Sequence, residues 1–225
     1  MTNRASTTVA GEMLVLLAER AGFWPGANTL LVADPHFGKA ASFRAAAVPV
    51  PRGTTDDALR RLDALIDELH VARIVFLGDF LHAREGRAPA TLDMIARWRE
   101  RRASVDMILV RGNHDRRAGD PPSELAITCV DGPMRESPFA FAHHPRAVDG
   151  AYVLAGHIHP GARLAGGGRD RARLPCFWFG EKIGVLPAFG DFTGLADVDP
   201  APPDQVWVIA DDVVLRVDAG AAAGS

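Results

Sequence analysis

The pattern of apolar and polar residues predicts alternating strands and helices in the first half of the chain. Residues 54–70 place apolar side chains at the spacing of one helix face: Ala58, Leu62, Leu65, Ile66 and Leu69. Thr54 or Thr55 can cap this helix. A second helix is expected over 89–102, beginning at a proline. Short apolar runs predict strands at 12–19, 28–36, 73–80 and 105–114, with a turn-rich connection over 20–27.

The second half of the chain is nearly all strands. Apolar runs predict them at 139–144, 151–159, 174–180, 182–190, 205–210 and 213–218. Strands that alternate with helices in the first half, followed by strands alone, indicate an α/β core. Its sheet gains antiparallel strands, and a second sheet packs against it. No repeat or linker divides the chain, so we expect one domain over residues 9–218, with disordered termini at 1–8 and 219–225.

The composition narrows the class of protein. A chain of 225 residues with 48% hydrophobic and 24% charged residues is typical of one soluble globular domain. It has no apolar stretch of the roughly 18 residues that a membrane span needs, and its first residues do not have the pattern of a secretion signal. Two cysteines, Cys129 and Cys176, are expected to be buried thiols, which favours a cytoplasmic location.

The positive charge is almost all arginine, since Lys39 and Lys182 are the only lysines. Residues 97–117 hold seven arginines against three acidic residues, and 163–173 hold four against Asp170. Guanidinium groups suit phosphate oxygens better than ammonium groups do, although a single arginine is more often a solvated surface charge.

Polar side chains collect at the ends of the predicted strands. Six of the eight histidines, two aspartates and one asparagine follow apolar runs: Asp34, His36, Asp79, Asn113, His114, His143, His144, His157 and His159. Ligand sites in open α/β sheets lie beyond the carboxyl ends of the strands. One such histidine would be a loop residue, but this many indicate a metal site.

The residue types indicate which metals fit. Oxygen and imidazole ligands without thiolate favour Mn²⁺, Fe, Zn²⁺ or Ni²⁺. In extended strands, Asp34 with His36 and His157 with His159 would each project to one side as a two-pronged ligand pair. So many ligands exceed the need of one ion and suit two ions that share a bridging carboxylate. Such a centre can activate water against a phosphoryl group.

Five short motifs carry a resemblance to a known family. "DPH", "GDFLH", "GNHD", "HH" and "GHIH" follow one another over residues 34 to 159 and resemble, in order, the motifs of the calcineurin-like metallophosphoesterases. Further stretches such as "VADPHFGKAASFR" and "LPAFGDFTG" are similar to the bacterial DNA-ligase-associated branch of that family, over roughly residues 11 to 217. The resemblance implies a four-layer α/β/β/α sandwich of two mixed sheets.

The resemblance also implies a ligand set. It assigns one ion to Asp34, His36 and His159, the other to Asn113, His143 and His157, and a bridging role to Asp79. Relatives have glycine after the first histidine of "HH", so we take His143 as the ligand, with His144 behind it. Mn²⁺ is the expected metal, with Fe, Zn or Ni as alternatives.

The same comparison of motifs suggests catalytic residues. His114 matches the residue that faces the scissile phosphate, and Asp115 would orient it from behind. His82 stands where many relatives have an acidic residue, and it either contacts phosphate or supports Asp79. Weaker candidates for substrate contact are Arg84, Arg87, Arg116, Arg117, His144, Lys39 and Arg44. Gly166–Gly168 is expected to be a flexible loop, and Trp24, Trp98, Trp178 and Phe177 are expected in the core.

The expected function is a metal-dependent phosphodiesterase, an endonuclease that hydrolyses single-stranded DNA during repair, without membrane contact. Hydroxide generated at the dinuclear site would attack phosphorus in line, and His114 would protonate the leaving oxygen. A DNA ligase and a helicase are the expected protein partners. Two alternatives remain: a phosphoesterase for nucleotides or diphosphates, and a metal-bound scaffold for a partner protein, against which the intact motifs argue.

Overall fold

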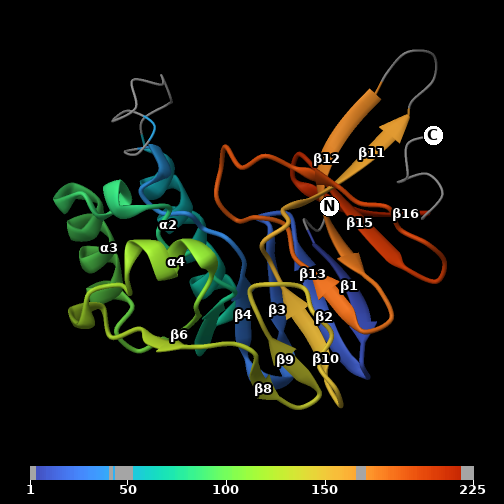
Figure 1. The fold of residues 1–225 in the computed structure, drawn as a ribbon, viewed down its shortest axis with the longest axis horizontal. Helices are drawn as coiled ribbons and strands as arrows, with labels where there is room; N and C mark the ends of the chain where they lie inside the picture. The colour runs from blue at the N-terminus through green and yellow to red at the C-terminus, as the bar shows by residue number, and fades with distance from the viewer. Residues whose placement is uncertain (1–3, 41–42, 44–52, 166–170, 219–225) are drawn as a thin grey trace.

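Two sheets packed face to face form the centre of the molecule, and helices cover the outer face of the first sheet (Figure 1). The computed structural model describes residues 4–40, 43, 53–165 and 171–218. The first sheet has the order β1 (Arg4–Val9), β2 (Glu12–Leu17), β3 (Ala21–Trp24), β4 (Thr29–Val32), β5 (Arg73–Phe76), β6 (Asp106–Val110) and β7 (Thr128–Val130). Strands β1 to β4 pair antiparallel and β4 to β7 pair parallel, so the sheet is mixed.

The second sheet is also mixed. Its order is β14 (Ala196–Asp197), β11 (Pro160–Ala165), β12 (Arg171–Phe179), β13 (Ile183–Val185), β10 (Tyr152–Ala155), β9 (Phe139–Phe141) and β8 (Met134–Glu136). Strand β15 (Gln205–Ala210) pairs with β12 and with β16 (Val213–Val217). The central strands β9, β10 and β13 run parallel. The expected sandwich of two mixed sheets is therefore confirmed.

The helices follow strands of the first sheet. Helices α2 (Thr54–Leu69) and α3 (Pro89–Arg101) were expected, whereas α4 (Asn113–Ala118) and the 3-10 turns η1 (Pro25–Ala27), η2 (Arg84–Arg87) and η3 (Ser123–Leu125) were not. Within the described ranges, no helix covers the outer face of the second sheet, so these residues do not supply the second helical layer of a four-layer arrangement.

The expected cap of α2 is wrong. The helix begins after Gly53, whose φ of 92° suits glycine, and no side chain caps it. Thr55 lies inside the first turn, where its hydroxyl instead accepts a hydrogen bond from the backbone N–H of Gly38 at 3.1 Å. This contact ties α2 to the loop that follows β4.

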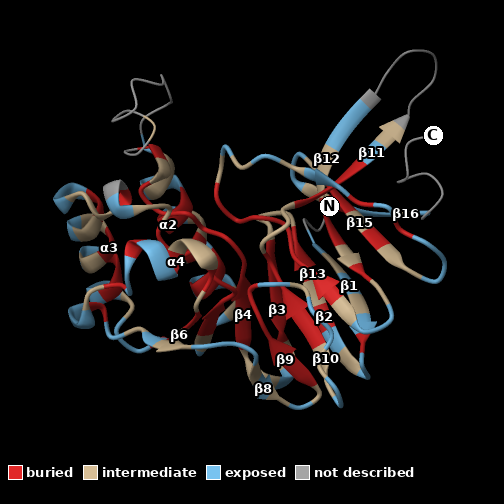
Figure 2. Cartoon of the chain, viewed as in Figure 1, coloured by how far each residue is buried: buried red, intermediate tan, exposed pale blue. Residues whose placement is uncertain are grey.

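The core has two principal layers because the central strands are apolar on both faces. Figure 2 shows that these strands are largely buried. In β4, Leu30 and Val32 pack against α2 and α3, while Leu31 and the adjoining Ala33 face the second sheet. Side chains alternate between the faces of a strand, so a short continuous apolar run is what a strand buried on both faces requires. The parallel strands around the centre are thus held from both sides.

Among the described residues, six strands occur where none was expected: β1, β3, β7, β8, β11 and β14. Residues 20–27 were assigned to a connection, but Ala21–Trp24 forms β3, a fully buried strand that pairs with β2 and β4. Residues 1–8 were expected to be disordered, but β1 begins at Arg4 and pairs along its whole length with β2. Residues 1–3 and 219–225 and the loop at Gly166–Gly168 lie outside the described residues.

The other core expectations hold in most positions. Trp24, Trp98 and Phe177 are buried, and Trp178 is partly buried with its indole N–H donating to Asp204 at 2.9 Å. Cys176 is buried, whereas Cys129 is only partly buried, and both thiols are free. Of the helices described, none has the length and apolar character needed to cross a bilayer.

Candidate metal centre

The seven predicted ligands meet beyond the carboxyl ends of parallel strands from both sheets. Strands β4, β5 and β6 of the first sheet lead to Asp34 and His36, Asp79, and Asn113, while β9 and β10 of the second lead to His143, His157 and His159. Parallel strands end at a common edge, and the two sheets face each other there. Segments that are distant in sequence are therefore neighbours in space, as His36 and His159 show, which are 123 positions apart.

One group of ligand atoms gathers around His143. Its Nδ1 contacts the carbonyl oxygen of Leu77 at 2.9 Å, which leaves the lone pair on Nε2. That Nε2 lies 2.9 Å from Asn113 Oδ1, 3.0 Å from His157 Nδ1 and 3.4 Å from Asp79 Oδ1. Ligands about 2.1 Å from one ion stand about 3.0–3.4 Å apart, so the three distances from His143 Nε2 match the spacing within a coordination shell.

A second group gathers around Asp34 and His36. His36 Nε2 lies 3.4 Å from His159 Nε2 and 3.9 Å from Asp79 Oδ2. His159 Nε2 lies 3.8 Å from Asp34 Oδ1. The two oxygens of Asp79 thus face different groups, Oδ1 toward His143 and Oδ2 toward His36. This is the arrangement that a carboxylate bridging two ions requires.

Burial and charge at this place fit divalent cations. Asp34 and Asp79 are 0% and 2% exposed, and the ion-pair partners that the described residues provide for them are histidines. Asp34 Oδ1 is buried with no hydrogen-bond partner. Burial raises the pKa of Asp79, with the Asp34 carboxylate contributing. Carboxylates this deeply buried are unfavourable unless positive charge compensates them, and bound cations would supply it.

The imidazoles are suited to act as neutral ligands. Burial lowers the pKa of His36 far below its ordinary value, and nearby Lys39 and His159 lower it further. Burial and the adjacent His143 lower the pKa of His157 to about 4. Both rings are therefore neutral at physiological pH, which is the form that binds a metal.

The backbone around the ligands is not extended. Asp34, His36, Asp79, His157 and His159 have φ values of 50°, 46°, 52°, 74° and 50°. The expected extended geometry is therefore wrong, because the backbone turns after each strand. Asp34 and His36 still lie in one group, whereas His157 and His159 join different groups. Non-glycine residues with positive φ cost about 1 kcal/mol or more each and collect at functional sites.

Three glycines outside the predicted site make room for the ligands. A Cβ on Gly78, Gly112 or Gly156 would overlap the side chain of His143, Asp79 or Asp34, respectively. Each of these glycines directly precedes a ligand, in "GD", "GN" and "GH". That repeated position was the available signal in the sequence, since close approach of backbone to a side chain requires glycine.

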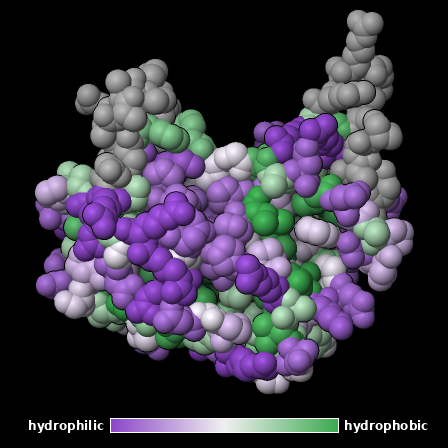
Figure 3. Space-filling model, viewed as in Figure 1, coloured by the Kyte–Doolittle hydropathy of each residue, from purple (hydrophilic) through white to green (hydrophobic). Residues whose placement is uncertain are grey.

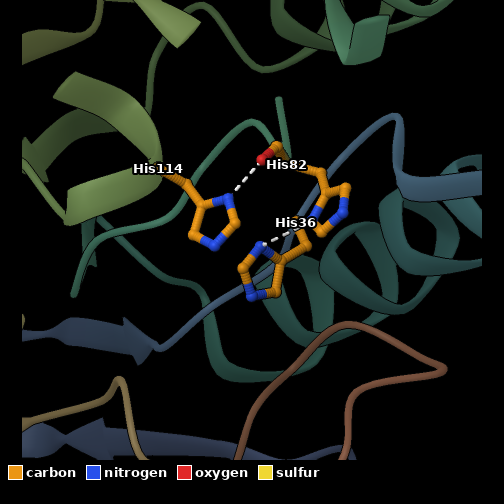
Figure 4. Close-up of side chains that lie close together, drawn as sticks. All are labelled: His36, His82 and His114. Atoms are coloured by element: carbon orange, nitrogen blue, oxygen red, sulfur yellow. Dashed lines mark hydrogen bonds between the residues drawn. The ribbon is translucent and has the colours of Figure 1, made fainter. Parts of the chain in front are cut away.

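His114 and His82 lie together beside the second ligand group (Figure 4). The His114 Nδ1 contacts the carbonyl oxygen of His82, so its other nitrogen, Nε2, faces inward, 3.9 Å from Asp79 Oδ2. The two rings stack with centroids 5.1 Å apart, and His82 Nδ1 lies 3.5 Å from His36 Nδ1. His82 thus contacts both a predicted ligand and His114.

Asp115 does not orient His114 in the way expected. Its buried carboxylate accepts hydrogen bonds from the backbone N–H groups of Asp79 at 2.7 Å, Phe80 at 2.9 Å and Gly112 at 2.8 Å. The His114 ring is held by His82 instead. Because α4 begins at Asn113, the Asp115 side chain turns back over the helix start and reaches the loop after β5. It therefore holds the backbone that carries the Asp79 carboxylate.

The choice between the two adjacent histidines agrees with their burial. His143 is 3% exposed and supplies Nε2 to the group around Asn113. His144 is exposed, and its ring packs on His143 and His157 with centroids 4.8 Å and 4.1 Å apart. His144 therefore lies at the rim of the centre. The ligand assignments themselves remain predictions.

The weaker candidates divide by their contacts. Arg84 and Arg87 donate to the carbonyl oxygens of residues 117–120 at the end of α4, which is a structural role. Arg116 pairs with Asp131 at 2.9 Å on the surface, and Arg117 is exposed. Lys39 is half-buried over the Phe43 ring, and burial lowers its pKa. Arg44 lies outside the described residues.

Comparison with known proteins agrees with this geometry. Residues 27–159 match the family of calcineurin-like phosphoesterases. The solved structure of the Pseudomonas putida nuclease MPE is 42% identical, with a TM-score of 0.84, covering 95% of this chain and 100% of that one. Yfce, a phosphoesterase from E. coli, is 18% identical with a TM-score of 0.38, covering 83% of this chain and 90% of that one. No curated protein matches the chain.

Proposed function

The chain belongs to the calcineurin-like phosphoesterase family, and we propose that it is a metal-dependent endonuclease that hydrolyses single-stranded DNA. The observation that carries the proposal is the division of Asp79 between two ligand groups, Oδ1 toward His143 and Oδ2 toward His36. The similarity to a nuclease over nearly the whole chain supports nucleic acid as the substrate.

Members of the family bind two divalent metals, and the residues present fit such a pair. Asp34, His36 and His159 would hold one ion and Asn113, His143 and His157 the other, with Asp79 shared. Two bound ions supply activation of water at neutral pH and neutralisation of charge on the phosphoryl oxygens. We propose Mn²⁺, since the donors are carboxylate, amide and imidazole without thiolate.

The protein's own contribution to cleavage centres on His114. Its Nδ1–H donates to the carbonyl oxygen of His82, so the proton that it exchanges is on Nε2, which faces the centre. The side chain is 30% exposed, which leaves space for substrate. As an imidazolium, His114 donates the Nε2 proton to the leaving sugar oxygen. His82 holds the ring in that orientation through its carbonyl oxygen and its stacked imidazole.

We further propose that the protein works in the cytoplasm during DNA repair, beside a DNA ligase and a helicase. The free thiols of Cys129 and Cys176 support a reducing compartment. The repair setting and partners rest on the motifs shared with the DNA-ligase-associated branch of the family.

The test uses circular single-stranded DNA, which has no ends and is opened only by an endonuclease. Metal-stripped protein is incubated with single- and double-stranded circles, with Mn²⁺, Mg²⁺, Zn²⁺ or Ni²⁺ added separately. We expect linear product from single-stranded circles with Mn²⁺. The matched variant is Asp79→Ala, which should bind fewer metal ions and lose activity on every substrate.

A nucleotide panel and bis(p-nitrophenyl) phosphate are assayed in parallel. Hydrolysis of nucleotides without any cut in DNA would favour a small-molecule phosphoesterase over a nuclease. Two tightly bound metals and normal turnover in Asp79→Ala would refute the bridged centre itself. Hydrolysis of no substrate by a metal-loaded protein would favour the scaffold alternative.

A further inference from the structure

A small cavity is lined in part by His143, one of the predicted ligands of the metal centre. Its volume is about 230 Å³, and its lining includes Arg111, Arg116, Arg146, His143 and His144. His143 is shared: its Nε2 contacts Asn113 Oδ1 in the metal centre, while its side chain also lines this cavity. We call this cavity the arginine pocket. Anything bound in it lies within one side chain of the metal ligands.

The arginine pocket is lined by cations and not by anions. No acidic residue is among its described lining residues. Two of its arginines pair with carboxylates that do not line the pocket. Arg111 donates two hydrogen bonds of 2.7 Å to the Asp120 carboxylate, and Arg116 donates one to Asp131. The Arg116 pair is exposed on both sides, at 60% and 65%, so it is weak and readily exchanged for a ligand.

Arg146 differs from these two arginines. Within the part of the chain that the structure describes, no carboxylate pairs with its guanidinium. Its backbone N–H donates to the carbonyl oxygen of His144 at 2.9 Å, a tight turn that holds the base of the side chain against the pocket. A guanidinium on a fixed base without an internal partner is available to an external anion.

The chemistry selects the anion. A guanidinium group can bind two phosphate oxygens through two parallel hydrogen bonds. A pocket lined by carboxylates or by apolar side chains has no such donors. The hydrophilic surface over α4, which carries Arg116, is continuous with other polar side chains on the face in Figure 3. A DNA strand crossing the metal centre would place a further phosphate on either side of the one that is cut.

We propose that the arginine pocket binds the phosphate next to the scissile phosphate on one side, with Arg146 as the principal contact. The proposal rests on the proposed nuclease function and deepens it. The pocket makes a polynucleotide a better substrate than an isolated phosphodiester, because the second phosphate is bound beside the centre. It also fixes the direction in which the strand crosses the two ligand groups, since the pocket lies on the His143 side of the centre.

The test replaces one charge at a time. The substrates are short oligonucleotides in which the phosphate on the 5′ or the 3′ side of the scissile bond is either native or a neutral methylphosphonate. Cleavage at the one chosen bond is followed by chromatography of the products with Mn²⁺ present. We expect the wild type to lose about tenfold in kcat/KM on one of the two neutral substrates and little on the other.

The variants are Arg146→Ala and, as a matched control, Arg135→Ala. Arg135 is also exposed, but it donates to the carbonyl oxygen of Asp149 and does not line the pocket. Arg146→Ala should cleave the native oligonucleotide about as slowly as the wild type cleaves the sensitive methylphosphonate oligonucleotide. The methylphosphonate should cause no further loss of kcat/KM in this variant. Arg135→Ala should behave as the wild type. Thermal unfolding and metal content report whether either variant is misfolded.

The outcomes separate the two proposals. A wild type that cuts the oligonucleotides but ignores both methylphosphonates overturns the arginine pocket and leaves the nuclease function standing. An unchanged methylphosphonate penalty in a folded Arg146→Ala variant also overturns it, since the phosphate would then be bound elsewhere. A wild type that cuts none of the oligonucleotides, yet hydrolyses an aryl phosphodiester, overturns both.

Discussion

The side chain of Asp115 offers the sharpest single test of how this centre is held together. Its Oδ2 accepts from the backbone N–H groups of Asp79 and Gly112, and its Oδ1 accepts from that of Phe80. An asparagine at this position keeps the shape but has one acceptor oxygen and one NH₂ group. Whichever way the amide turns, its NH₂ group meets a backbone N–H, so at least one of these bonds is lost.

The expected loss of stability in Asp115→Asn follows from these contacts. A hydrogen bond to a charged group contributes about 1.5–3 kcal/mol, and a buried donor left without a partner costs about 1–3 kcal/mol. Asp115 is 1% exposed, and burial raises its pKa, so removing the buried charge offsets part of the loss. We expect Asp115→Asn to lower the free energy of unfolding by about 2–4 kcal/mol, a large share of the roughly 5–15 kcal/mol typical of a domain.

The assay compares urea unfolding of metal-stripped wild type, Asp115→Asn and Asp120→Asn. Asp120 is the matched control because its carboxylate is 44% exposed and pairs with Arg111 on the surface. Its substitution should cost at most about 1 kcal/mol. Mn²⁺ binding and the hydrolysis of DNA and of an aryl phosphodiester are then measured for all three proteins.

If Asp115 positions Asp79, the asparagine variant loses metal affinity and loses both activities together. A variant as stable as Asp120→Asn, with normal metal binding and a defect on DNA alone, would refute this reasoning. That pattern would mean that Asp115 acts on His114 instead.

Three further predictions concern the histidines and arginines around the centre. His114→Ala should lower DNA cleavage about 10²–10⁴-fold, because the sugar alkoxide needs a proton, and should spare an aryl phosphodiester whose leaving group departs unaided; an equal loss on both substrates would point to damaged metal binding. His82→Ala removes the neighbour of both His36 and His114, so we expect the same defect together with weaker Mn²⁺ binding in a titration, and full activity would contradict it. Replacing Arg116 and Arg117 together by alanine should flatten the salt dependence of DNA binding, since arginine–phosphate contacts release counterions, and an unchanged slope would make them simple surface charges.

A last prediction concerns pH in the metal-stripped protein. The folded state holds the pKa of His157 at about 4, below the 6.5 of an unfolded chain. Between these values the unfolded chain binds a proton that the folded protein does not, so stability is complete above pH 6.5 and falls as the pH drops toward 4. The urea midpoint in EDTA should therefore be lower at about pH 5 than at about pH 7. Equal midpoints, with the chain still fully folded in both buffers, would contradict the lowered pKa.

Local patterns were sufficient to predict the elements that have a strong period of their own. The five apolar positions of α2 lie on one helix face, and the proline at 89 begins α3, so both helices were predicted within a residue or two of their bounds. The apolar runs before Asp34, Asp79 and Asn113 form the strands β4, β5 and β6. Because parallel strands end at a common edge, the meeting of these residues was also predictable from the order of the elements.

Short or weakly patterned elements were not predictable in this way. Strand β3 contains only Ala21–Trp24 between turn residues, and its partners β2 and β4, not its own sequence, hold it in the sheet. Strand β1 is polar at most positions, because it is an edge strand that pairs on one side only. Helix α4 has six residues and directly follows a strand, so its period is too short to detect.

The amino-acid sequence by itself determined the chemistry of the centre: which carboxylates and imidazoles exist, on which strand ends they lie, and that glycine precedes three of them. Tertiary structure alone decided their geometry and their partners. The positive φ of Asp34, Asp79 and His157 is imposed by the packing of loops from both sheets, since side-chain identity does not specify it. Asp115 holds the loop after β5 from 36 residues away, and His143 Nε2 contacts Asn113 Oδ1 from 30 residues away. Such contacts depend on segments that are distant in sequence, and no local pattern encodes them.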